Sequence, residues 1–259
     1  MRKQLVILIM LIFGFAAQFC LADSVIFESS IPSKRDQQLV LTGVLVKPNG
    51  NGPFPAVVLL HGCTGLEDGK TRSEAWSKRL VDWGYVTLQL DSFGPRGIID
   101  VCNKWSSIIM RNRSHDAYDA KSYLSELSYV DRNRIAVLGW SHGGKTVLNI
   151  IENTYGDETP FTAAVAFYPP CSFLVQPNAP LMILIGESDD WTTAYRCSQA
   201  MPSRTTEHEI ILKIYPGAYH DFDWEGIDKL YLGHRLKYDP KAAEDAIVRV
   251  KDFLARHFK

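Results

Sequence analysis

The chain has 259 residues, of which 46% are apolar and 22% are charged. Its length excludes a peptide hormone or a small domain held together only by disulfides, and its apolar content excludes a disordered chain. The 28 Lys and Arg residues are balanced by 29 Asp and Glu residues, which gives a net charge of -1. A near-neutral chain has no general attraction to a polyanion, so nucleic acid is not an expected partner.

The first residues of the chain carry the pattern of an export signal. Arg2 and Lys3 give a short basic start, an uncharged apolar run follows over residues 5–13, and small residues come next. We therefore expect residues 1–22 to be a signal peptide and residues 23–259 to be the mature domain. The mature protein is then expected to be exported, and either periplasmic or secreted.

Two other interpretations of this first segment stay open. One is an uncleaved membrane anchor, although Gly14 and Gln18 interrupt an apolar core that is already short for a membrane span. The other is a lipid-modified Cys20, although such processing needs a small residue where Phe19 stands. We expect cleavage after Ala22 and no stable membrane span in the mature protein.

Short β-rich runs recur along the mature chain and predict about eight strands. The first two runs have the amphipathic pattern of a hairpin, whereas the later ones are almost wholly apolar, as strands covered on both faces must be. The predicted strands cover residues 25–29, 39–46, 56–60, 85–90, 135–139, 162–167, 181–185 and 209–215.

Helical patterns lie between these strands, at residues 72–83, 114–127, 143–152, 193–201 and 241–258. Alternation of strand and helix predicts an α/β fold, with a mainly parallel sheet flanked by helices on both sides. No repeat or linker divides the chain, so we expect a single domain without a separate cap domain. Ligands of such sheets bind at the carboxyl edge, and the long loops at residues 92–111 and 221–239 are expected to shape the entrance.

A nucleophile elbow is the strongest single motif in the sequence. The predicted strand at residues 135–139 runs into Gly-Trp-Ser-His-Gly-Gly at residues 139–144 and then directly into a helical pattern. Such a turn holds its serine in a strained backbone conformation, and the flanking glycines let strand and helix pass closely. Ser141 is therefore the candidate nucleophile.

A serine nucleophile needs a histidine that takes its proton and an acid that orients the histidine. His220 follows the last predicted strand, in a loop that can bring its ring back over the serine, and it is the expected general base. Asp189 lies three residues after the glycine that follows the strand at residues 181–185, and it is the expected acid. Asp190 and Glu187 are the alternatives.

The negative charge that develops on a carbonyl oxygen under attack must meet preorganised donors. The backbone N–H of His142, directly after the nucleophile, is one expected donor, and the N–H of Cys63 is the other. Cys63 lies in the turn His-Gly-Cys-Thr-Gly at residues 61–65, which follows an early strand. The alternative is that His61 and Gly62 form only a tight turn.

Together these motifs resemble the dienelactone hydrolase family of α/β-hydrolases. The likeness also includes Asp-Ser-Phe-Gly-Pro-Arg-Gly at residues 91–97, Phe-Tyr-Pro-Pro-Cys at residues 167–171, Gly-Glu-Ser-Asp-Asp-Trp and Tyr-His-Asp-Phe, and it spans essentially the whole mature chain. The resemblance implies the α/β-hydrolase fold and a hydrolase activity. Ser141 is a departure, because the founding members carry a cysteine at the elbow, and in this respect the chain resembles the esterase-like branch.

The resemblance also implies a carboxylate-binding arginine after the fourth strand, and Arg96 stands at the matching position. A guanidinium group suits a carboxylate, so Arg96 favours anionic esters; the alternative is that it braces its loop through Asp91 or Asp100. Several aromatic residues near the motif loops either line an acyl pocket or pack in the core. They are Trp140, Tyr168, Trp191, Phe222 and Trp224, of which the first three are expected to bind substrate.

Four cysteines remain after the expected cleavage, an even number in an exported protein, which predicts two disulfides. Their places relative to the strands favour pairing of Cys63 with Cys102 and of Cys171 with Cys197, and four buried thiols are the alternative. Motifs for metals, phosphates and dinucleotides do not occur, so neither a cofactor nor a metal is expected.

The sequence thus predicts a serine hydrolase that cleaves a small carboxylic ester or lactone through an acyl-enzyme. The same three side chains would serve an acyltransferase or a peptidase, in which an alcohol or an amine takes part instead of water. A binding module with a vestigial triad is a third, non-catalytic hypothesis. The sequence does not predict the oligomeric state.

Overall fold

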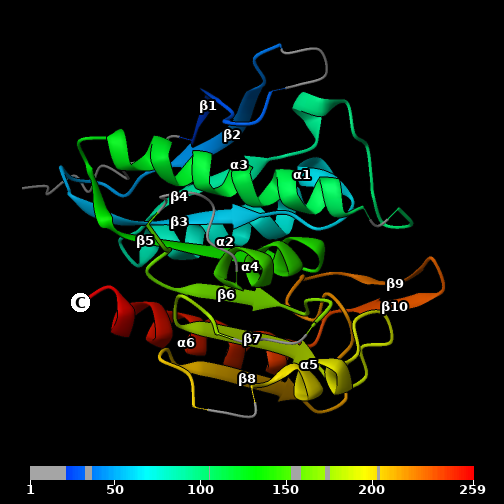
Figure 1. Ribbon diagram of the computed structural model, residues 1–259. Helices are drawn as coiled ribbons and strands as arrows, with labels where there is room; N and C mark the ends of the chain where they lie inside the picture. The colour runs from blue at the N-terminus through cyan, green and yellow to red at the C-terminus, as the bar shows by residue number, and fades with distance from the viewer. Residues whose placement is uncertain (1–21, 33–36, 105, 153–158, 173–175, 203–204) are drawn as a thin grey trace, which may run out of the picture.

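The structure is a computed structural model that describes residues 22–259, apart from residues 33–36, 105, 153–158, 173–175 and 203–204. The expected signal peptide, residues 1–22, therefore lies outside the described residues except for Ala22. Figure 1 shows one central twisted sheet with helices on both of its faces. None of the described helices combines the length and the apolar character that crossing a bilayer requires.

Eight strands form the central sheet, in the spatial order β1-β2-β4-β3-β5-β6-β7-β8. β2 pairs antiparallel with β1 and with β4, and every other neighbouring pair is parallel. This confirms the predicted mainly parallel sheet of about eight strands. The strands are β1 (Ala22–Glu28), β2 (Val40–Val46), β3 (Phe54–Leu60), β4 (Val86–Asp91), β5 (Val130–Trp140), β6 (Ala164–Phe167), β7 (Leu181–Gly186) and β8 (Ile210–Tyr215).

The helices cover the two faces of the sheet as an α/β fold requires. α3 and α4 pack against each other on one face, and α2 and α6 lie on the other (Figure 1). The ammonium group of Lys251 in α6 lies 5.8 Å from the ring centre of Trp83 at the end of α2. The described helices are α1 (Gly65–Asp68), α2 (Lys70–Asp82), α3 (Ser107–Glu126), α4 (His142–Glu152), α5 (Ala194–Ala200), α6 (Pro240–His257) and the short 3-10 helix η2 (Gly94–Arg96).

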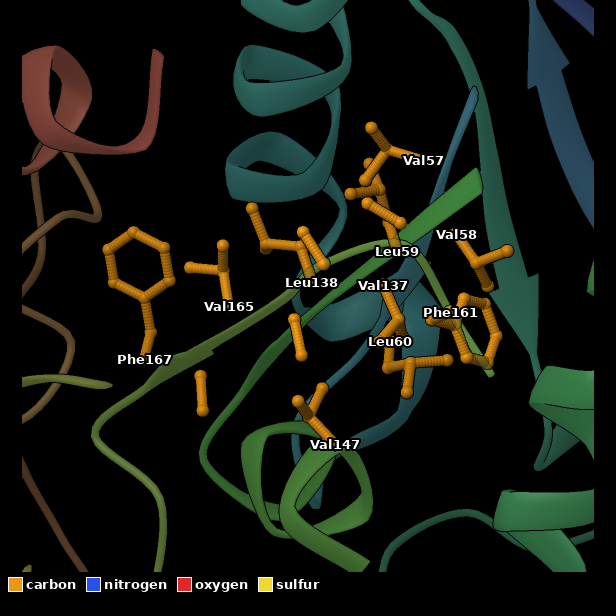
Figure 2. Packing of buried hydrophobic residues seen from close by; sticks show 14 of the residues in the cluster. Val57, Val58, Leu59, Leu60, Val137, Leu138, Val147, Phe161, Val165 and Phe167 are labelled. Carbon is orange, nitrogen blue, oxygen red and sulfur yellow. The ribbon is translucent and has the colours of Figure 1, made fainter. Parts of the chain in front are cut away.

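The middle of the sheet is buried on both faces. Most of β3 and the whole of β6 and β7 are inaccessible to solvent, and so is the second half of β5. Figure 2 shows part of this core, in which valines and leucines of β3 and β5 lie near Val147 of α4 and Phe167 of β6. Continuous apolar runs in these strands are therefore explained by helices on either side.

Two segments differ from the sequence-based expectation. Helix α3 begins at Ser107 and not at residue 114, so it takes up the end of the expected loop at residues 92–111. Ile108 in its first turn is exposed, which obscures the amphipathic pattern there. The expected loop at residues 221–239 contains a two-stranded hairpin, β9 (Asp228–Tyr231) and β10 (His234–Lys237).

Candidate active site

Ser141 lies in the turn between β5 and α4, with a backbone φ of 52°. This left-handed conformation is unfavourable for a residue with a side chain and persists only where the surroundings enforce it. The surroundings here are tight, because a Cβ atom on Gly143 would lie 2.1 Å from the carbonyl oxygen of Leu60. A Cβ atom on Gly139 would lie 2.4 Å from the carbonyl oxygen of Gly143. The two glycines are thus required by the close approach of strand and helix.

His220 and Asp189 form a buried pair at the ends of β8 and β7. Nδ1 of His220 lies 2.7 Å from Oδ2 of Asp189, and both side chains are almost fully buried. Thr192 fixes the carboxylate, since its N–H donates to Oδ1 and its hydroxyl donates to Oδ2, each at 2.8 Å. Because a carboxylate can only accept, Nδ1 carries the proton and Nε2 of the neutral ring is left to accept one.

The two members of this pair shift each other's pKa in opposite directions. Burial acts to lower the pKa of His220, but the adjacent Asp189 carboxylate outweighs burial and raises that pKa above its ordinary value. Burial acts to raise the pKa of Asp189, but His220 and Thr192 hold that pKa below its ordinary value. Each partner therefore favours the charged form of the other.

The two alternative acids lie elsewhere. Oδ1 of Asp190 is 3.4 Å from Nδ1 of His234, and the carboxylate is half exposed. Glu187 accepts a hydrogen bond from the N–H of Gly217 at 3.2 Å and is exposed. Asp189 is thus the carboxylate of this turn that contacts His220.

Ser141 and His220 line one pocket at the carboxyl edge of the sheet, together with Gly62, Cys63 and Trp191. The space between the lining atoms is about 390 Å³, which includes open solvent at the mouth of the pocket. The β9–β10 hairpin forms another part of its wall. Within the described part of the chain, His, Cys, Asp and Glu side chains do not cluster in threes as ligands of a metal ion would.

The structure contains both expected disulfides, Cys63–Cys102 and Cys171–Cys197. The first one joins the turn that carries the expected oxyanion donor to the loop before α3, and the N–H of Val101 donates to the carbonyl oxygen of Cys63 at 2.9 Å. The wall of the pocket at Cys63 is therefore held both by a covalent bond and by a backbone hydrogen bond.

The two turns that carry the expected oxyanion donors are joined beneath the pocket by Arg113. One Nη atom of this buried residue donates to the carbonyl oxygen of His61 at 2.6 Å, and the other lies 2.5 Å from Nδ1 of His142. Arg113 thus links the turn after β3 to the start of α4. Both expected donors, the N–H groups of Cys63 and His142, belong to these linked segments.

Arg96 is held in a salt bridge. Its guanidinium group donates to both carboxylate oxygens of buried Asp116, at 2.7 and 2.8 Å, and to the carbonyl oxygen of Ser92 at 2.8 Å. It therefore braces its loop, although through Asp116 and not through Asp91 or Asp100. Among the described residues, the lining of the pocket does not include Arg96.

The aromatic residues expected to bind substrate separate into two groups. Trp191 lines the pocket, with its ring centre 5.2 Å from that of His220. Trp140 and Tyr168 are fully buried, and both donate to the carboxylate of Asp223, at 3.0 and 2.6 Å. Trp76 also donates to this carboxylate, at 2.7 Å, so these rings are tied to one buried carboxylate and are not among the residues that line the pocket.

Sequence patterns do not reveal a second charged pair at the site, Arg72 and Asp221. Nη1 of Arg72 lies 2.5 Å from Oδ1 of Asp221, and both residues line the pocket. One signal could have identified Arg72. It lies four and eight residues before Trp76 and Leu80, which are buried on α2, so it is a charged residue on the apolar face of a helix.

Comparison with known proteins gives a family match and several distant relatives. The sequence profile of the family described as "Dienelactone hydrolase family" matches residues 41–258. A protein of Aspergillus terreus named "Probable dipeptidyl-aminopeptidase B" is 28% identical over 151 residues, which are 53% of this chain and 16% of the relative. The protein of the same name from Arthroderma otae is 32% identical over 153 residues, 54% of this chain and 16% of the relative. The chain spans about a sixth of the length of these curated relatives.

Solved structures show the same fold at low identity. A dienelactone hydrolase from Anabaena variabilis matches 92% of this chain and 99% of its own, with a TM-score of 0.64 and 17% identity. The dienelactone hydrolase-like promiscuous phosphotriesterase P91 from metagenomic libraries matches 91% of this chain and 99% of its own, with a TM-score of 0.68 and 19% identity. Dipeptidyl peptidase 4 from Porphyromonas gingivalis matches 92% of this chain but 36% of its own, with a TM-score of 0.62 and 18% identity.

Proposed function

Because the chain belongs to the dienelactone hydrolase family of α/β-hydrolases, we propose that it is a serine hydrolase that cleaves a carboxylic ester or lactone. Ser141 is the nucleophile, His220 the general base and Asp189 the acid that orients the base. One observation carries this proposal. His220 contacts Asp189 at 2.7 Å and lines the same pocket as the strained serine of the elbow.

The proposed reaction has two steps that share one base. Oγ of Ser141 attacks the ester carbonyl carbon while Nε2 of His220 takes its proton, and the N–H groups of Cys63 and His142 receive the oxygen that becomes negative. His220 then gives the proton to the leaving alcohol, and an acyl-enzyme remains. In the second step His220 activates a water molecule, which releases the acid and restores Ser141.

The substrate in this proposal is a small molecule. The enclosed part of the pocket is small, which suits a compact acyl group better than a long chain. Its lining balances two cationic side chains, Arg72 and Lys229, with two acidic ones, Asp68 and Asp221. An anionic substrate is not part of the proposal, because Asp116 holds the guanidinium group of Arg96.

A fluorophosphonate probe tests the assignment of the nucleophile. We expect the purified chain to be labelled at one serine and Ser141→Ala to lose the label, together with hydrolysis of small aryl esters. Ser188→Ala is a matched control, because it changes a serine in the neighbouring turn before Asp189 and is expected to keep both activities. Absence of label in the unmodified chain, or label that persists in Ser141→Ala, contradicts the proposal and favours a binding module.

Peptidase action is the second candidate, and the names of the distant relatives favour it. The same triad would then cleave an amide, and the leaving amine would take the proton from His220. Matched ester and amide substrates with the same acyl group separate the two reactions. Hydrolysis of the ester alone supports the esterase proposal, whereas comparable kcat/KM on the amide supports the peptidase. Product analysis with added alcohol detects acyl transfer.

We further propose that residues 1–22 direct export and that the mature domain acts in the periplasm or outside the cell. The two disulfides support this proposal, since such bonds form and persist in oxidising compartments.

A further inference from the structure

Arg72 is a buried arginine held in one orientation. Its side chain is 4% exposed, and Nη1 donates to Oδ1 of Asp221 at 2.5 Å and to the hydroxyl of Tyr168 at 3.0 Å. The rings of Trp140 and Trp224 lie 5.1 and 4.8 Å from its guanidinium carbon. The position of the cation is therefore fixed before any ligand binds.

The opposite edge of this guanidinium group consists of Nε and Nη2. Both hydrogen bonds described above involve Nη1, and Nε is buried without a hydrogen-bond partner among the described residues. Burying a donor without a partner is unfavourable, and the described part of the protein does not itself satisfy this edge of the group at Nε. Because Nε is also closed to solvent, a ligand in the pocket would meet this edge at Nη2.

Nη2 of Arg72 lies close to the nucleophile, so it would meet a ligand near the atom that Ser141 attacks. Nη2 of Arg72 lies 3.7 Å from the point that a Cβ atom on Gly62 would occupy, and Cβ of Ser141 lies 4.0 Å from the same point. All three residues line the pocket. Because Gly62 has no side chain, a space remains between Arg72 and Ser141.

We propose that Arg72 is a catalytic residue whose Nη2 donates to the substrate oxygen that becomes negative when Ser141 attacks. It acts as a third donor beside the N–H groups of Cys63 and His142. The inference rests on the proposed serine hydrolase function and adds a residue to it. A rigid cation in a site that excludes water stabilises developing charge without having to reorganise.

The charge on Arg72 is compatible with a neutral substrate. Asp221 already balances the cation in the resting site, so no anionic group on the substrate is needed. Burial acts to lower the pKa of Arg72, but Tyr168, Asp221 and Asp223 outweigh burial and hold it above its ordinary value. The group therefore keeps its proton throughout the reaction, and His220 remains the only proton carrier in the proposed mechanism.

A pair of inhibitors tests this role. A trifluoromethyl ketone forms a tetrahedral adduct with the serine and carries the negative oxygen, whereas the alcohol obtained by reducing it fills the pocket without forming the adduct. In Arg72→Gln we expect kcat/KM and the affinity for the ketone to fall together, by about 10²-fold or more, as for loss of one oxyanion donor. The affinity for the alcohol is expected to stay close to that of the unmodified enzyme.

Arg96→Gln is the matched control, because Arg96 is also an arginine paired with a buried carboxylate but binds Asp116 and not the pocket. We expect this variant to keep the ketone affinity even if its unfolding midpoint falls. If Arg72→Gln does not fold, Arg72→Lys replaces it, since lysine keeps the charge but has no second terminal nitrogen to donate to the substrate while it pairs with Asp221. The lysine variant is expected to lose affinity for the ketone and not for the alcohol.

The outcomes separate this inference from the proposed function. If Ser141→Ala still reacts with the fluorophosphonate probe, the serine hydrolase proposal itself is wrong. If labelling depends on Ser141 but the Arg72 variants bind the ketone as tightly as the unmodified enzyme, Arg72 is not an oxyanion donor. An equal loss of affinity for ketone and alcohol also overturns the inference, because it indicates a change in the packing of the pocket.

Discussion

The imidazole of His220 is buried against a carboxylate, and this pairing sets the pH range of the proposed reaction. A general base acts in its neutral form, so kcat/KM is expected to rise as the pH rises through the pKa of His220. Because Asp189 holds that pKa above its ordinary value, we expect the midpoint of this rise above about pH 6.5. The pH dependence of kcat/KM on a neutral ester measures it.

Asp189→Asn provides the control for this prediction. The amide removes the negative charge while His220 stays buried, so the midpoint is expected to move to lower pH, and kcat is expected to fall by about 10⁴-fold because the ring loses its orienting acceptor. Asp190→Asn, at the exposed neighbour that contacts His234, is expected to leave the midpoint unchanged. An unmoved midpoint in Asp189→Asn would contradict the assignment of the acid.

The proposed triad could be suggested from the sequence, because each of its residues follows the end of a strand. Ser141, Asp189 and His220 each follow a recognisable strand, and the glycine pattern of the elbow has a steric cause that the structure shows. The role of Arg72 could not be predicted in this way. Its surroundings come from segments more than 60 residues away in the chain, including Trp140 and Asp221.

Removing either disulfide tests how much each one contributes to stability and to activity. They close loops of similar size, with sequence separations of 39 and 26 residues. Replacing both cysteines of either bond by alanine is therefore expected to lower the free energy of unfolding by about 3–4 kcal/mol in each case. The effects on activity are expected to differ, because Cys63 is in the wall of the pocket.

Urea unfolding and aryl ester hydrolysis measure these two effects. We expect Cys63→Ala/Cys102→Ala to lower kcat, since the turn with the proposed oxyanion donor loses its covalent link. Cys171→Ala/Cys197→Ala is expected to keep kcat at temperatures where it stays folded. Equal loss of kcat in both double variants would show that the first disulfide has no special role in the site.

Among the elements, the strands of the central sheet could be predicted and those of the β9–β10 hairpin could not. β3, β6 and β7 are apolar throughout because helices cover both faces, and a continuous apolar run is visible in any sequence. β9 is only four residues long and mostly exposed, so no continuous apolar run distinguishes it from a loop. The N–H of Lys237 at the end of β10 donates to the carbonyl oxygen of His220 at 3.0 Å, a contact that brings the hairpin to the site.

At the scale of the whole molecule, the sheet explains why Ser141, Asp189 and His220, which are far apart in the sequence, lie beyond the same edge. β5, β6, β7 and β8 are neighbours in that order, and they are parallel. Ser141, Asp189 and His220 follow the first, third and last of them, so their side chains start from the same edge. The predicted parallel sheet already places the ends of these strands at one edge, and the strand order comes from the structure.

The last prediction concerns the whole chain: we expect it to be exported with removal of residues 1–22. If residues 1–22 are a cleaved signal, the exported protein begins at Asp23 and has no titratable thiol, because Cys20 is removed and the other four cysteines are paired. Mass spectrometry and thiol titration of the protein recovered outside the cytoplasm measure both properties. The mature domain made in a reducing cytoplasm is the control, and it is expected to have four thiols and a lower unfolding midpoint. A membrane-bound product that retains residues 1–22 would indicate an anchor.

The hydrogen bonds that Trp76 and Trp140 donate to Asp223 also give the molecule two natural probes. Indole N–H protons resonate apart from the crowded amide region of an NMR spectrum, and both of these protons are shielded from solvent. Their signals therefore report on the packing around Asp223 without any chemical tag. Slow exchange of these protons with deuterium would follow the integrity of this packing in each variant, before an inhibitor is added.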